Sequence, residues 1–116
     1  MELDKKIEAF LWALKVGDLD KIKEILNKEN PTFLSSKVLH QEPLVVAADY
    51  GHSTLLDHLI SKYDLNVNVR DENNISPMDA AISEDHVECV KILLKHNAKK
   101  VNHNNEYYTK FTQNAA

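Results

Sequence analysis

Apolar side chains recur along this chain at the spacing of short amphipathic helices. Leu44, Ala47 and Ala48 form the i, i+3, i+4 face of one helix. Pro43 precedes them and can occupy the first helical turn, where its missing N–H costs nothing. Gly51 then interrupts the pattern and can adopt a left-handed backbone conformation. The pattern predicts a short helix that begins at Pro43 and ends before Gly51.

A second apolar face follows this glycine. We expect its helix to begin at Ser53 or Thr54 and to carry four apolar side chains, Leu55, Leu56, Leu59 and Ile60. The first third of the chain has the same plan. There Asp18 is a good N-cap residue for a helix over Leu19–Lys28, because its side chain can accept hydrogen bonds from the first free N–H groups. The hydrophobic pattern therefore predicts pairs of helices.

The helix pair recurs with a period of 34 residues. Ala13, Ala47 and Ala81 align at this offset. The other aligned sets are Gly17/Gly51/Asp85, Asp18/His52/His86, Ile22/Leu56/Val90, Ile25/Leu59/Leu93 and Leu26/Ile60/Leu94. Such self-similarity is typical of units that stack into a solenoid. We expect one all-α domain over residues 1–116, with units at about 1–36, 37–70 and 71–103 and a partial unit at 104–116. Because Asp85 replaces a glycine, the turn of the third unit should be tighter or strained.

The repeated motif resembles the ankyrin repeat. The family signature T-P-L-H-x-A is matched by Glu42–Ala47 and by Ser76–Ala81, although both copies lack its Thr and His. Gly51-His52 occupies the family's turn between helices, and Asn66–Asn68 resembles the start of its connecting hairpin. The resemblance implies a stacked array of helix pairs that binds proteins through a concave face and its hairpin tips. The departures from the signature predict a less stable array than an idealised one.

Composition and charge narrow the classes of partner. Acidic residues outnumber Lys and Arg by 18 to 14, and the net charge is −4. Because nucleic-acid binders usually carry a basic stripe, we expect no nucleic acid and favour a basic protein surface. No run approaches the roughly 20 apolar residues of a membrane span, and the N-terminus lacks the features of a signal peptide. With Cys89 as the single cysteine, we expect a cytoplasmic or nuclear monomer without disulfides.

Candidate binding residues come from the predicted concave face and hairpins. Asp49 and Tyr50, with Glu84 in the slot of Tyr50, precede the turns between helices; each is either ordinary solvated surface or a contact for a basic partner. Trp12 occupies an interior slot and either packs within the first unit or acts as an exposed interface anchor. The hairpin over 71–75 should project beyond the helices, with Asp71, Glu72 and Ile75 as contacts. The preceding tip over 38–41 should expose apolar groups, with an altered turn at His40.

The sequence contains few features that would indicate catalysis or metal binding. His52 and His86 are equivalent in the repeat, so stacking explains their recurrence. No H-E-x-x-H motif and no cysteine pair are present. Cys89 shares its slot with Leu55 and is expected to be a buried small hydrophobe. We therefore predict no catalytic residues, no metal and no cofactor.

The resemblance extends to one small cytosolic member of the ankyrin family over nearly the entire chain. Phe10–Lys15, Gly17–Asp20, Ala47–Asp49 and His86–Lys91 resemble its segments in order. That protein binds the heterodimeric actin capping protein, so the resemblance implies steric inhibition of barbed-end capping. The alternative is a different ankyrin adaptor or inhibitor, for example one that binds a cyclin-dependent kinase.

Overall fold

Helices dominate the computed structural model of the protein, which describes residues 2–28 and 31–99. They form three consecutive pairs: α1 (Glu2–Val16) with α2 (Leu19–Lys28), α4 (Pro43–Asp49) with α5 (Ser53–Tyr63), and α6 (Pro77–Ser83) with α7 (Val87–Lys95). Within the described ranges there is no strand, and the predicted all-α solenoid is confirmed. The partial unit predicted at 104–116 lies outside the described residues.

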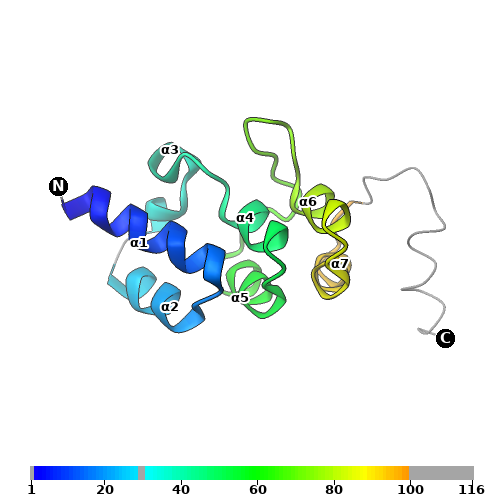
Figure 1. The fold of residues 1–116 in the computed structure, drawn as a ribbon, viewed down its shortest axis with the longest axis horizontal. Coiled ribbons are helices and arrows are strands. Elements are labelled where there is room, and N and C mark those ends of the chain that lie inside the picture. Colours follow the sequence, from blue (N-terminus) through cyan, green and yellow to red (C-terminus); the bar gives the residue numbers. More distant parts are fainter. Residues whose placement is uncertain (1, 29–30, 100–116) are drawn as a thin grey trace.

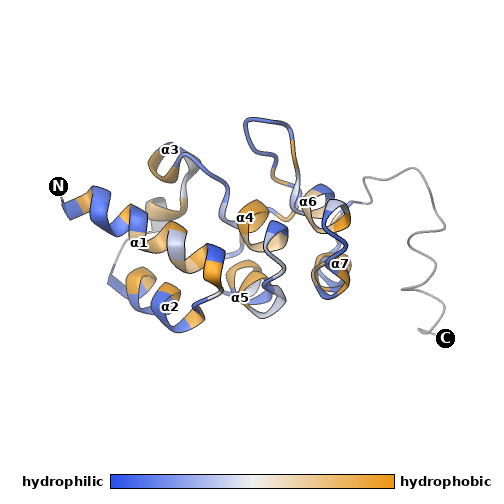
Figure 2. Ribbon diagram, viewed as in Figure 1, coloured by the Kyte–Doolittle hydropathy of each residue, from blue (hydrophilic) through white to orange (hydrophobic). Residues whose placement is uncertain are grey.

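The pairs stack in chain order into an elongated array (Figure 1). Helix α4 lies between α1 and α6, and α5 packs against α7. Ala13, Ala47 and Ala81 are almost completely buried where the first helices of the pairs meet. Their small side chains let neighbouring helices approach closely. Figure 2 shows hydrophobic residues along the middle of the array and hydrophilic ones in the loop that projects before α6.

The helix termini agree with the sequence signals. Pro43 is in the first turn of α4, and Lys21 N donates to the Asp18 carboxylate at the start of α2 at 3.1 Å. Gly51 has a φ of +79°, as the break in the pattern predicts. Asp85 adopts a φ of +55°, so the expected backbone strain occurs in the third turn. Within residues 2–28 and 31–99, none of the helices combines the length and the apolar character needed to cross a membrane.

The segment between the first two pairs differs from the expected hairpin tip. It contains a 3₁₀ turn (Pro31–Leu34) and the one-turn helix α3 (Ser36–Leu39). Leu39 is buried instead of exposed, and Phe33 packs edge-on against Phe10 with ring centroids 5.3 Å apart. His40 takes the positive φ that a glycine would supply. The prediction of exposed apolar groups at this tip is wrong for Leu39, because the segment covers the core beside α1.

Candidate protein-binding groove

Two adjoining hollows form one open groove beside the projecting loop. The larger has a volume of about 550 Å³, and both are floored by Val45 and Val46 of α4. Residues 70–73 form the wall of one hollow, and Asp71 is shared by both. Because α4 carries no long side chain at 45 and 46, the groove retains an apolar floor between polar walls. We call this surface the concave groove.

The walls of the concave groove are acidic. The carboxylates that line it are Glu42, Asp49, Asp71, Glu72 and Asp79. Two basic residues, Lys15 and Arg70, also line it, and Arg70 is paired with Asp79 at 3.1 Å. The remaining acids create a negative potential between low-dielectric walls, which attracts cationic groups. A basic protein surface fits this groove.

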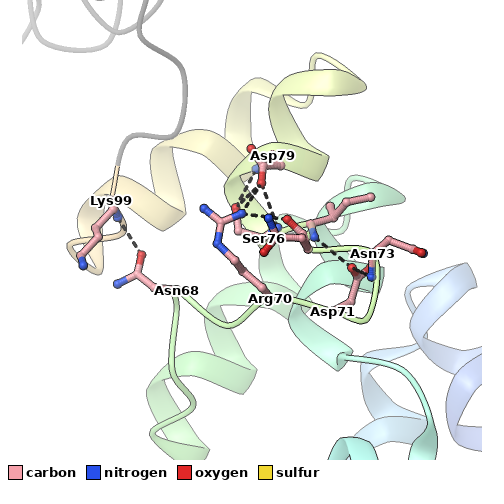
Figure 3. Close-up of polar contacts among 9 residues, drawn as sticks. Asn68, Arg70, Asp71, Asn73, Ser76, Asp79 and Lys99 are labelled. Atoms are coloured by element: carbon pink, nitrogen blue, oxygen red, sulfur yellow. Dashed lines mark hydrogen bonds and ion pairs between the residues drawn. The ribbon is translucent and has the colours of Figure 1, made fainter.

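The projecting loop is held in one conformation by its own polar groups (Figure 3). One oxygen of Asp71 accepts hydrogen bonds from the backbone N–H groups of Asn73 at 2.9 Å and Ile75 at 3.0 Å. The Asp71 N–H donates to the Ile75 carbonyl at 3.0 Å. Asn74 has a φ of +63°, a left-handed conformation that asparagine tolerates better than most residues. The loop therefore needs little reordering to make contacts.

The base of the loop is tied to the start of α6. Arg70 Nη1 donates to the Asn74 carbonyl at 2.8 Å and to Asp79 Oδ2 at 3.1 Å. Ser76 and Asp79 form a reciprocal capping box at the helix N-terminus. The candidate contacts derived from the sequence did not include Arg70 or Asp79. The spacing S-x-x-D from Ser76 was the available signal, because a capping box has that form.

Five of the seven predicted binding residues lie in the concave groove: Asp49, Tyr50, Asp71, Glu72 and Ile75. Glu84 is exposed at the end of α6 but does not line it. Trp12 lies outside it too, yet 66% of its surface is exposed, so its ring does not pack inside the first unit. Its repeat equivalents Val46 and Ala80 line the groove, so by register Trp12 belongs to the same row.

Exposed apolar side chains continue this row across the first two pairs. Val16 and Tyr50 occupy equivalent slots and each has 49% of its surface exposed. Trp12 precedes Val16 by four residues and therefore shares its helix face. Ile75 of the loop is 38% exposed. Clustered exposed apolar groups rimmed by polar ones are typical of interaction sites.

The single cysteine, Cys89, is unsuited to act as a nucleophile. Burial raises the pKa of the Cys89 thiol to about 11, with a smaller contribution from Glu88, so the nucleophilic thiolate is absent at neutral pH. Within residues 2–28 and 31–99, no three His, Cys, Asp or Glu side chains converge as metal ligands. What the arrangement offers chemically is a surface for recognition.

Comparison with known proteins places the chain among repeat proteins. Residues 10–105 match the family described as ankyrin repeats in three copies. Alpha-latrocrustotoxin-Lt1a from Latrodectus tredecimguttatus is similar to the chain, with 33% identity over 92 residues. That match covers 79% of this chain and 6% of the toxin, so the chain spans a small fraction of this curated relative's length.

Proposed function

Because the chain belongs to the ankyrin-repeat family, whose repeats form protein-interaction modules, we propose that its concave groove binds a basic surface of a partner protein. The acidic walls around the Val45–Val46 floor carry this proposal. Such a groove accepts a Lys or Arg at its walls and an apolar side chain at its floor. Electrostatic complementarity of this kind favours the correct partner and speeds encounter.

Asp49 and Tyr50 provide the central contacts in this proposal. Both are exposed and both line the groove. A guanidinium that approaches the Asp49 carboxylate can also lie over the neighbouring aromatic ring, and cation–π contacts contribute about 0.5–1 kcal/mol at exposed sites. Trp12 adds a second aromatic surface in the same row. Tyr, Trp and Arg are the residues that most often dominate binding energy at interfaces.

A particular partner follows from the resemblance to myotrophin. We propose that the partner is the heterodimeric actin capping protein and that the complex blocks capping sterically. The proposal is supported by the ordered resemblance of segments such as Phe10–Lys15 and His86–Lys91, and by an acidic groove suited to basic capping-protein residues. Covering those residues would leave more barbed ends free to grow. A different ankyrin adaptor or kinase inhibitor would use the same groove chemistry.

Actin polymerisation in the presence of capping protein tests this partner. Wild-type protein should restore barbed-end growth, whereas Asp49→Arg should not, because the reversed charge repels a basic patch and costs several kcal/mol of binding. Glu88→Arg is the matched control, since Glu88 is an exposed acid on α7 outside the groove. The free energy of unfolding of both variants should lie within about 0.5 kcal/mol of the wild-type value, as is usual for surface substitutions.

Two experiments distinguish an error in the partner assignment from an error in the assignment of the binding surface. If wild-type protein leaves capping unchanged at high micromolar concentration, the capping-protein assignment is wrong. Affinity capture from a lysate then tests the groove itself: proteins retained by wild type and by Glu88→Arg should be lost with Asp49→Arg. Recovery of a kinase in this pattern would favour the alternative partner. Equal capture by all three proteins would contradict binding through the concave groove.

A further inference from the structure

A second groove lies between α1 and α2, on residues separate from the concave groove. Its volume is about 240 Å³. The residues that line it are Lys5, Lys6 and Ala9 of α1 and Lys21, Glu24, Ile25 and Lys28 of α2. Ala9 is partly buried and Ile25 is 9% exposed, so they form a recessed apolar floor. The lysines form the rim.

The 34-residue register identifies this surface as the stacking face of the first pair. Lys5 and Lys21 correspond to Leu39 and Leu55, which are 1% and 2% exposed in the continuous core. Helices α3 and α5 therefore bury apolar groups at the positions where the first pair presents ammonium groups. A further ankyrin repeat stacked here would have to desolvate these charges, which is costly without partners. The face is thus suited to a different kind of occupant.

The charge of this groove is opposite to that of the rest of the chain. Four lysines and one glutamate give its lining a formal charge of 4 − 1 = +3, whereas the whole chain carries −4. Glu24 is paired with Lys21 at 3.7 Å. The N-terminal half of α1, which supplies Lys5 and Lys6, is strongly hydrophilic (Figure 2). A surface that serves solubility alone intersperses charges of both signs, whereas lysines outnumber the glutamate by four to one in this lining.

We propose that the groove between α1 and α2 binds an acidic protein segment that inserts an apolar side chain. Carboxylates of the segment would contact the lysine rim, and its apolar group would cover Ala9 and Ile25. A flat bilayer cannot reach a floor recessed behind lysine side chains. A nucleic acid would leave that floor unmatched and would meet Glu24 on a chain of net negative charge. The combination of rim and floor therefore favours an acidic, partly apolar peptide over either.

Peptide arrays on the full chain test this proposal. The probes are short peptides rich in Asp and Glu with one Leu, Ile or Phe at varied positions. One control set replaces the acids by Asn and Gln, and another replaces the apolar residue by Ser. Wild-type protein should bind members of the first set and neither control set. For peptides so selected, the double variant Lys5→Glu/Lys28→Glu should raise the Kd about tenfold, because reversing two rim charges replaces attraction with repulsion.

Lys37→Glu is the matched control, because Lys37 is an exposed lysine on α3 outside the groove. It should bind the selected peptides like wild type, and Asp49→Arg should as well. Urea unfolding confirms that each variant folds. The proposal is overturned if no acidic peptide binds, if the Lys5/Lys28 variant binds unchanged, or if the Ser-substituted set binds equally well. The proposal is also overturned if the wild type binds anionic vesicles, RNA or a second copy of the chain through these lysines but binds no acidic peptide.

Discussion

At the residue scale, a glycine of one pair and a histidine of the next hold neighbouring pairs together. His52 Nε2 lies 2.7 Å from the Lys15 carbonyl, and His86 Nε2 lies 3.0 Å from that of Asp49. The ring of His86 covers Gly51, where an added Cβ would come within 2.6 Å of Nδ1. Gly51 is therefore required both for its positive φ and for the space that the ring occupies. This explains why glycine and histidine recur together in the repeat.

Gly51→Ala should destabilise the protein by at least about 1–2 kcal/mol, the cost of a left-handed backbone for an L-residue. The clash with His86 adds to this. Urea unfolding of the single variants and of Gly51→Ala/His86→Ala separates the two causes. In the His86→Ala background the cost of the alanine should be smaller. An equal cost in both backgrounds would show that only the backbone conformation matters.

His58 is a partly buried residue whose ring nitrogen Nε2 has no hydrogen-bond partner. Its Nε2 atom is buried and makes no hydrogen bond, and its ring lies edge-on to Tyr63. Burial lowers the pKa of His58 below its ordinary 6.5, Lys23 and Lys62 lower it further, and Asp57 partly opposes them. The folded state therefore holds this imidazole neutral at pH values where the unfolded chain already binds a proton.

The free energy of unfolding should accordingly fall as the pH drops below about 6.5, because the unfolded state then binds more protons than the folded state. Above that pH the imidazole is neutral in both states and contributes no pH dependence. His58→Leu removes this contribution, and its repeat equivalent Ile92 shows that the slot accepts an aliphatic group. Chemical unfolding between pH 7.5 and 5 should give a flatter profile for the variant. Parallel profiles would contradict this account of His58.

At the element scale, the first helices of the second and third pairs are shorter than the second helices they pack against, with seven residues each in α4 and α6 against eleven in α5 and nine in α7. Helix α4 spans seven residues, six of them buried, because it lies between α1 and α6. Helix α5 buries Leu55, Leu56, Leu59 and Ile60, as its apolar pattern predicts. On the side of the second helices, His96 and Lys95 at the end of α7 contact Asp57 of α5 at 2.7 and 3.5 Å. The hydrogen bond from His96 is the main cause that lowers the pKa of Asp57.

Ala47→Leu and Ala81→Leu should each cost about 1–3 kcal/mol, because both sites are completely buried and extra methylene groups overpack the helix contacts. Ser83→Leu is the matched control on an exposed position of α6. It should change stability by no more than about 0.5 kcal/mol. The midpoint of urea denaturation measures the stability of each of the three variants. Equal midpoints would show that the assignment of inner and outer helix faces is wrong.

At the scale of the whole molecule, the array separates two surfaces of opposite charge. The concave groove is acidic and the groove between α1 and α2 is basic. Each combines its charge with an apolar floor, so each discriminates by sign and by shape. If both proposals hold, a basic partner and an acidic one would occupy separate surfaces of the molecule.

Binding of a basic protein to the concave groove should weaken as salt is raised. The Debye length shortens from about 10 Å at 0.1 M to about 3 Å at 1 M ionic strength, which screens the attraction of the groove's carboxylates. Titration of the captured partner at increasing salt measures the slope of affinity against ionic strength. Asp49→Arg should flatten or reverse that slope, whereas Glu88→Arg should leave it near the wild-type value. A slope of zero for wild type would mean that charge does not drive the contact.

The sequence alone determined the helix pairs, their 34-residue register and most of the core. These depend on local signals: Pro43 at a helix start, Gly51 at a turn, and alanines at a fixed offset. Local signals suffice here because each repeat contacts only its neighbours. The repeat pattern also predicted the projecting loop and placed five of the seven candidate residues on the surface that lines the concave groove, since register assigns faces.

Only the tertiary structure decided how side chains share space between repeats. Trp12 is 66% exposed, whereas its repeat equivalents Val46 and Ala80 are 9% and 4% exposed. Arg70 joins the loop to α6 through Asp79, nine residues away, and the basic groove combines lysines from two helices. These features depend on distances between elements and on the volume that neighbouring residues leave. Periodicity records neither quantity, because it specifies which face a residue occupies and not what lies opposite.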